Sequence, residues 1–281
     1  GTFWSKNELF TKWTSIGYLI DFLYQYLDFS IQYKNKTYIK VEDLIKDYTQ
    51  HLYKIDYNYR RFREVLMEID IEGSLINKIN QMYNIFLDDI NYKYSLLIEK
   101  IDKYNIEGIK NQQIVWDDFV KQQGKKCIIF ADALNYELGK ELEEKLSQFE
   151  TQNTIMVSFL PSITEIGMSR LIMHRNEKLI LKSDNNGISI TTDEYERNLS
   201  YRDNRKEKML RDIPDLDFKE ISDILMQSTD NLNDNIVIFS RDIDNIGESG
   251  VSFAIEIFRN NIRDIIRVVN ILSNKGYTIF I

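Results

Sequence analysis

The sequence predicts a helical region over residues 1–122, followed by an α/β core with a mostly parallel sheet over residues 123–281. Two observations support this. Before Gln122, apolar residues recur at intervals of three and four, as on one face of a helix. After Gly124, short unbroken apolar runs, typical of buried parallel strands, alternate with helical patterns.

Four segments of the first region have a helical pattern, and one stretch does not. The helical segments are 10–22, 41–53, 59–69 and 75–101, whereas Ile31 to Lys40 predicts a hairpin. The stripe from Phe10 to Phe22 favours a helical core, and a surface for a partner protein is the alternative. Arg60, Arg61 and Arg63 favour a solvated helix face over a nucleic-acid surface, because acidic residues flank them.

The second region predicts strands and helices in alternation. The expected strands are 127–131, 154–159, 235–240 and 277–281, with a hairpin of 178–181 and 188–192. The expected helices are 134–149, 218–228 and 252–273, and the PSITEIGM stretch after the second strand leads into a helix that continues through Met173. Residues 198–214 are polar and are expected to be irregular.

Composition restricts the chemistry. The chain has 281 residues, one cysteine and a formal net charge of −8, and no apolar run reaches the roughly 18 residues of a membrane helix. Cys127 excludes an internal disulfide and a cysteine-based zinc cage, which fits a reducing compartment such as the cytoplasm. His51 and His174 are the only histidines; His51 is expected to be a packed helix residue, so oxygen ligands would dominate any metal site.

Polar groups follow three of the predicted strands. Asp132 follows the first, Ser162, Thr164 and Glu165 follow the second, and Asp242, Asp244 and Glu248 follow the third. Parallel strands bring such ends to one edge of a sheet, where open α/β sheets build their sites. A divalent cation there would lower the pKa of the Thr164 hydroxyl. The alternative is three separate helix caps and turns, with Asp132 capping the next helix.

Three motifs resemble those of PglZ domains, which belong to the alkaline phosphatase superfamily. FADALNYELGKEL (Phe130 to Leu142) is similar to the first, FLPSITEIGMSRLI (Phe159 to Ile172) to the second and SRDIDNIGE (Ser240 to Glu248) to the third. LYKIDYNYRRF (Leu52 to Phe62) resembles an Ile-Asp-x-x-Tyr-Arg segment found before PglZ cores in bacterial BREX phage-defence systems.

The resemblance implies an alkaline phosphatase-type fold with two divalent ions, zinc or manganese. It implies that Asp132, Thr164, Asp244 and Glu248 surround the metals and that Thr164 is the nucleophile. Glu248 stands where the wider superfamily often has histidine, which puts zinc in doubt, and Asn135 stands where many relatives have arginine. In the family, a strand like Tyr277–Ile281 is followed directly by an Asp-His-Gly motif, whose Asp and His complete one metal site. We therefore expect this chain to be the front part of a longer protein, which holds half a site. His174 is not expected to replace the histidine of that motif.

The expected function is a metal-dependent phosphodiesterase or nuclease-type domain of a bacterial phage-defence protein. The expected partners are other defence proteins and DNA or a nucleotide substrate, without a membrane. One alternative is an interaction scaffold with a vestigial site, and a monoester phosphatase or phosphomutase is another. The basic run from Arg202 to Arg211 is expected either to touch a nucleic-acid backbone or to be a mobile loop that leads into a helix.

Overall fold

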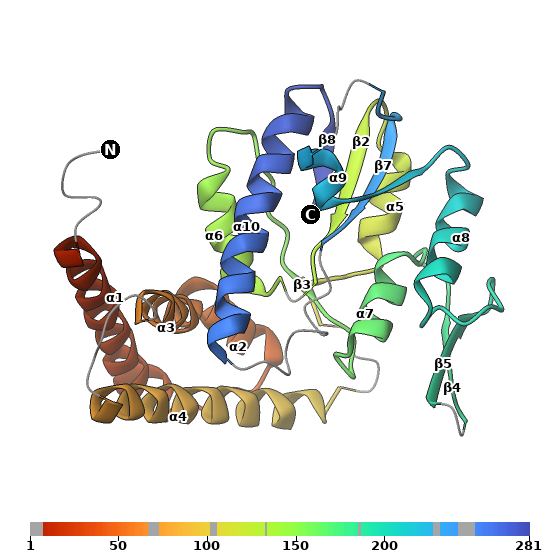
Figure 1. Ribbon diagram of the computed structural model, residues 1–281. Helices are drawn as coiled ribbons and strands as arrows, with labels where there is room; N and C mark the ends of the chain where they lie inside the picture. Colours follow the sequence, from red (N-terminus) through yellow and green to blue (C-terminus); the bar gives the residue numbers. More distant parts are fainter. Residues whose placement is uncertain are drawn as a thin grey trace. The chain divides into compact units, whose positions relative to one another are not determined.

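The computed structural model describes residues 8–66, 73–101, 106–132, 134–184, 187–226, 231–240 and 251–281 (Figure 1). The chain divides into two compact units. The first comprises residues 1–108, 135–144 and 244–259, and the second comprises 109–134, 145–243 and 260–281. The domain boundary at residue 122 stays a prediction. In the part of the chain that the structure describes, no helix is long and apolar enough to cross a membrane.

The first unit is built from helices (Figure 1). They are α1 (Glu8–Asp28), α2 (Val41–Asp47), α3 (Tyr53–Leu66), α4 (Gly73–Ile98) and α6 (Tyr136–Lys145), with π-helical turns η2 (Phe29–Tyr33) and η3 (Tyr48–Leu52). Helices α1, α3 and α4 share a core that contains Phe22, Phe62 and Phe86, each without solvent exposure. The expected hairpin at Ile31 to Lys40 is wrong, because α1 runs on into η2 and the chain reverses in a turn.

The predicted solvated face at Arg60 is also wrong, because Arg60 lies in a buried ion cluster that joins α3 to α6. Its Nε and Nη2 donate to the two carboxylate oxygens of Glu137 at 2.7 and 2.9 Å. Its guanidinium also bonds to Glu64 and Glu141, and all four side chains are buried. Arg61 binds Glu64 from the rim of the cluster. Buried charges persist when they are paired and hydrogen-bonded, as they are here.

The second unit contains a four-stranded parallel sheet in the order β6-β7-β2-β8. These strands are β6 (Asp217–Glu220), β7 (Asn235–Phe239), β2 (Lys126–Phe130) and β8 (Thr278–Phe280), and they alternate with α5 (Ile114–Lys121), α7 (Thr164–Leu171), α8 (Arg202–Asp212) and α9 (Ile221–Met226). Helix α10 (Val251–Ser273) belongs to this unit from residue 260 onward. Every residue of β2 is buried, as its unbroken apolar run predicts. The hairpin of β4 (Leu179–Asp184) and β5 (Gly187–Thr192) confirms the predicted one.

Three expectations for this unit are wrong. The strand at 154–159 shrinks to β3 (Met156–Val157), which pairs with β1 (Lys110–Asn111) in a separate small sheet. The polar stretch 198–214 contains helix α8, because its long side chains cover apolar surface with their stems. Phe218 begins no helix, since β6 runs to Glu220 before α9 starts.

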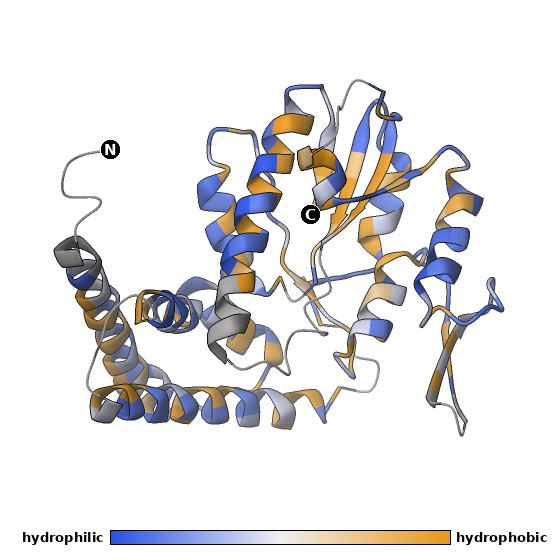
Figure 2. Cartoon of the chain, in the orientation of Figure 1, coloured by the Kyte–Doolittle hydropathy of each residue, from blue (hydrophilic) through white to orange (hydrophobic). Residues whose placement is uncertain are grey.

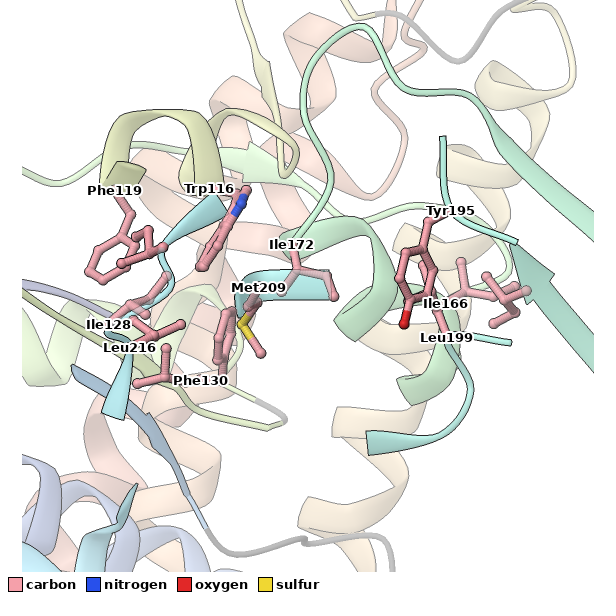
Figure 3. Close-up of a cluster of buried hydrophobic side chains, with 13 residues drawn as sticks. Trp116, Phe119, Ile128, Phe130, Ile166, Ile172, Tyr195, Leu199, Met209 and Leu216 are labelled. Atoms are coloured by element: carbon pink, nitrogen blue, oxygen red, sulfur yellow. The ribbon is translucent and has the colours of Figure 1, made fainter. Parts of the chain in front are cut away.

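One core cluster holds β2, α5, α7 and α8 together (Figure 3). Ile128 and Phe130 of β2 belong to it, and so do Ile166 of α7 and Met209 of α8. Helix α7 therefore packs against the same apolar cluster that covers the end of β2, which positions its first residue, Thr164, relative to the sheet.

Candidate active site at the sheet edge

Strands β2 and β7 end together at the carboxyl edge of the parallel sheet. Phe130 and Phe239 are register partners, and the backbone N–H of Ser240 donates to the carbonyl of Phe130 at 2.9 Å. Two of the three expected strand ends therefore meet at one edge. The third expected strand does not end at this edge, because β3 pairs with β1 in a separate two-stranded sheet.

Asp132 lies two residues beyond β2, and its backbone is fixed to the end of β7. Its backbone N–H donates to Ser240 Oγ at 3.2 Å, and its Oδ2 is buried. Asp132 does not cap the following helix, because Asn135 Oδ1 accepts the backbone N–H of Leu138 and caps α6 at Tyr136. Asn135 therefore caps α6 in place of Asp132, contrary to the simpler explanation of Asp132 as a cap.

Thr164 is the first residue of α7 and is half-buried. The cis peptide bond between Leu160 and Pro161 precedes it, and Ile163 is the extended residue at which the helix begins. The N–H groups of a first helical turn have no intrahelical acceptors and carry the positive end of the helix dipole. A hydroxyl at this place can meet a phosphoryl group that those N–H groups bind.

Asp244 and Glu248 lie outside the described residues. Within the described ranges, no three His, Cys, Asp or Glu side chains gather as a metal-binding group. The four-ligand set implied by the resemblance thus stays a prediction, with Asp132 and Thr164 as its described members.

Arg170, which sequence reasoning missed, is a buried cation near the end of α7. It is 8% exposed, and its guanidinium stacks on the ring of Phe159 at 3.5 Å from the centroid. Within the described part of the chain its Nε has no hydrogen-bond partner, and burial lowers its pKa to about 10. A charged residue four positions after the apolar Ile166, on the same helix face, was the signal that could have revealed it.

The basic residues of α8 have different surroundings. Arg205 is held inward, because its Nη1 donates to the carbonyls of Leu199 and Ser200 at 2.8 and 2.9 Å. Arg202 lies 4.1 Å from the ring centroid of Phe239, at the end of β7, and also bonds to Glu220. Lys206 lies over the same ring at 6.0 Å. Among the described residues of α8, Arg202 and Lys206 thus lie next to the end of β7.

His174 is engaged in a structural network. Its Nδ1 lies 2.7 Å from Asp117 Oδ1, and its Nε2 lies 3.2 Å from Asp212 Oδ2. Asp212 also accepts the indole N–H of Trp116 at 2.7 Å. Burial alone would lower the pKa of His174, but the hydrogen bonds to Asp117 and Asp212 outweigh it and raise the pKa. His174 thus ties α5 and α8 to the loop that follows α7.

Residues 111–281 match the family model described as the BREX system PglZ alkaline phosphatase-like domain. A protein of Bacillus cereus (strain H3081.97) named "Alkaline phosphatase-like protein PglZ" is 30% identical over 147 residues. That match covers 48% of this chain and only 17% of the relative's length. No solved structure matches the chain significantly. Because the family model covers more than half of the chain, this protein belongs to the PglZ alkaline phosphatase-like domain family of BREX systems.

Proposed function

We propose that this chain is part of a metal-dependent phosphoryl-transfer hydrolase of the phosphodiesterase type, acting in bacterial phage defence with other defence proteins. The observation that supports the proposal is that Asp132 and Thr164 each lie two residues from a member of the same core cluster. Asp132 lies just beyond Phe130, and Thr164 lies two residues before Ile166, and both apolar residues belong to one core cluster. A fixed carboxylate and a helix-terminal hydroxyl thus flank the same cluster.

The described donors fit a divalent cation, because a carboxylate and a hydroxyl are oxygen ligands that Mn²⁺, Mg²⁺ and Zn²⁺ all accept. Asp132 and Thr164 would hold the metal ions together with Asp244 and Glu248. When bound, such ions lower the pKa of a coordinated hydroxyl and stabilise phosphoryl oxygens.

The protein's own contribution is position. The bond from the Asp132 backbone to Ser240 fixes the carboxylate's place at the sheet edge. Thr164 would attack phosphorus, and the N–H groups of the first turn of α7 would bind a phosphoryl oxygen. Attack by the Thr164 oxygen on a phosphodiester would form one oxygen–phosphorus bond and break the bond to one substrate alcohol, which leaves with the proton that the hydroxyl gives up. Threonine would then carry the rest of the substrate through a phosphodiester, and water would hydrolyse this bond, release a phosphomonoester and restore the hydroxyl.

The test is cleavage of a phosphodiester, bis(p-nitrophenyl) phosphate, by the full natural protein with Mn²⁺ or Zn²⁺. Thr164→Ala should abolish cleavage, while Thr164→Ser, which keeps the nucleophilic oxygen, should keep part of it. Asn153→Ala changes an exposed residue of the same unit and serves as a control for protein quality. Unchanged cleavage by Thr164→Ala would overturn the assignment of the nucleophile. Activity on p-nitrophenyl phosphate but none on the diester would favour a monoester phosphatase.

Arg202 and Lys206 favour a polyanionic substrate such as a nucleic-acid strand, because they place two cations on the ring of Phe239 beside the sheet edge. Replacing both by glutamate should weaken binding of single-stranded DNA, measured by fluorescence anisotropy. It should also make the plot of log binding constant against log salt concentration less steep, by roughly 0.7 in slope for each phosphate that the protein no longer neutralises. Arg211→Glu is a single-site control on the same helix, since Arg211 stacks on Tyr195 at 4.5 Å. Equal effects of both charge reversals would contradict this role.

An interaction scaffold with a vestigial site is the second candidate, and the exposed apolar residues of α1 favour it. The two candidates differ in their response to Asp132→Asn. A hydrolase should lose phage protection with this variant, whereas a scaffold should protect cells as well as the wild type does.

A further inference from the structure

Arg170 is a buried cation that has no carboxylate within ion-pair distance in the part of the chain that the structure describes. The residue is 8% exposed, and burial lowers its pKa to about 10. Its guanidinium lies over the ring of Phe159 at 3.5 Å from the centroid, and its Nη1 donates to Met173 Sδ at 3.8 Å. Its Nε is buried without a hydrogen-bond partner. These contacts leave the positive charge uncompensated and one donor unused.

The other buried cations among the described residues are compensated. Arg60 forms ion pairs with three glutamates, and Lys208 Nζ lies 2.6 Å from Glu177 Oε1. Lys126 Nζ donates to two backbone carbonyls at 2.9 and 3.0 Å. Burial of an ion costs more than a single stack on an aromatic ring returns, so the Arg170 charge destabilises the folded state. Such exceptions are expected at functional sites, where a ligand supplies the missing partner.

The surroundings of Arg170 indicate which ligand would compensate it. Phe159, on which the guanidinium stacks, immediately precedes the loop of residues 160–163, and that loop is exposed and leads to Thr164. At the other end of the loop, Ile163 starts α7 without a side-chain cap, because isoleucine has no polar side-chain atom. Helix α7 carries both hydrophobic and hydrophilic residues (Figure 2). An uncapped helix N-terminus and a buried guanidinium at the two ends of one exposed loop both favour an anion.

The guanidinium and the Thr164 hydroxyl occupy different places on α7. Arg170 lies six residues after Thr164, which corresponds to about 9 Å along the helix axis and about 120° around it. Long helical side chains lean toward the N-terminus, which agrees with the contact between Arg170 and Phe159. A phosphoryl group bound at the first turn of α7 would therefore leave Arg170 for a second anion. A strand with several phosphates can supply that anion, whereas a lone diester cannot.

We propose that Arg170 is the cation of a phosphate subsite, which binds a phosphate group other than the one that Thr164 attacks. The planar guanidinium suits two oxygens of one phosphate group, and the ring of Phe159 holds it in place. Assignment of this group to the substrate rests on the proposed hydrolase function, whereas the binding of phosphate by Arg170 does not. Arg170 is a binding residue and takes no part in bond cleavage.

NMR of the Arg170 Nε–H group tests the binding directly. In protein with isotope-labelled arginine, the Arg170 signal is the one that disappears in Arg170→Lys. Inorganic phosphate should shift this signal in a saturable way, and sodium chloride at the same ionic strength should not. The Arg60 signal is the internal control, because Arg60 is already bonded to glutamates and should not shift. No shift with phosphate, or an equal shift with chloride, would overturn the proposal.

Thermal unfolding of Arg170→Met separates a binding residue from a structural one. Methionine keeps an unbranched apolar stem and removes the charge, so the variant should unfold at the same temperature as the wild type or higher. Phosphate should raise the unfolding temperature of the wild type and not that of the variant, because a ligand of the native state stabilises it by mass action. A less stable variant together with a wild type that phosphate does not stabilise would indicate an internal partner for Arg170 and overturn the proposal.

Cleavage by the full natural protein tests whether the subsite serves the proposed reaction. Arg170→Met should raise the KM for a single-stranded oligonucleotide at least about tenfold, since a hydrogen bond to a charged group is worth that factor. The KM for bis(p-nitrophenyl) phosphate, which has one phosphate, should stay unchanged. Equal changes of KM with both substrates would overturn the role of Arg170 at a second phosphate. If the wild type cleaves neither substrate, the proposed function fails, and the NMR result decides the phosphate site by itself.

Discussion

Replacing Arg60 by methionine removes the central cation of the buried cluster between α3 and α6. Arg60 compensates Glu64, Glu137 and Glu141, and their side chains are at most 5% exposed. Removing one partner from a buried ion pair leaves an uncompensated charge and costs about 3–5 kcal/mol. Arg61 compensates part of the remaining charge, because it still reaches Glu64. We therefore expect a loss near the lower end of that range.

Hydrogen exchange of α6 measures this loss where it occurs. Because about 1.4 kcal/mol corresponds to a factor of ten, 3 kcal/mol should speed the exchange of protected α6 amides by about 10²-fold. The matched control is Arg63→Met on the same helix. Arg63 donates to the neutral side chain of Asn80 at 3.0 Å, so its removal strands no charge and should cost about 1 kcal/mol.

Acid should reduce the effect of Arg60→Met, because protonated glutamates no longer need a cation. Burial raises the pKa of Glu137 even though Arg60 opposes this, so recovery should begin above the ordinary pKa of glutamate. Equal exchange rates in Arg60→Met and Arg63→Met, or an effect of Arg60→Met that does not change with pH, would refute the reasoning.

Three further predictions concern titratable groups. Burial raises the pKa of Asp56 to about 6 although Tyr48 and Tyr83 donate to its carboxylate. This group therefore costs the folded state up to about 3 kcal/mol as pH rises from about 4 to 6, and Asp56→Asn should flatten that part of the denaturation profile. His174 should titrate above pH 6.5 in an NMR titration. Protonated His174 therefore stabilises the folded state fully below that pH, and this contribution is lost as pH rises through the raised pKa. Asp117→Asn should lower the pKa of His174, because it removes one of the hydrogen bonds that raise it. Burial raises the pKa of the Cys127 thiol, so a thiol reagent at pH 8 should react with it only after unfolding, and fast reaction of the native chain would contradict its burial.

Local patterns sufficed for the parts of the fold that local physics determines. The unbroken apolar runs at Cys127 and Ile236 became the paired central strands β2 and β7. The 3.6-residue periodicity located α4 and α10, and α7 begins at Thr164, inside the second motif. The place of Asp132 beyond a strand followed from the same rules.

The misses have a common cause, which is pairing between distant residues. Arg60 resembles a solvated helix residue in its local sequence, and its partner Glu137 lies 77 positions away. The strand expected at 154–159 is short because its pairing partner is Lys110–Asn111 rather than the main sheet. The apolar stripe of α1 gave no sign that Phe22 would be buried while Trp13 stays exposed, because that depends on where α3 and α4 pack.

Metal binding by the full natural protein tests the central claim most directly, which is that Asp132 belongs to a metal-dependent site at the sheet edge. Titration with Mn²⁺, followed by calorimetry and by the decrease of the free-ion electron paramagnetic resonance signal, compares the wild type with Asp132→Asn. Asp118→Asn is the control, because the Asp118 carboxylate forms an exposed ion pair with Arg175, whose loss should cost under about 1 kcal/mol. We predict that Asp132→Asn lowers the Mn²⁺ affinity at least about tenfold, since loss of even an outer partner of a ligand costs that much, and that Asp118→Asn leaves it unchanged. Equal affinity in all three proteins, or no binding in the wild type, would contradict the account.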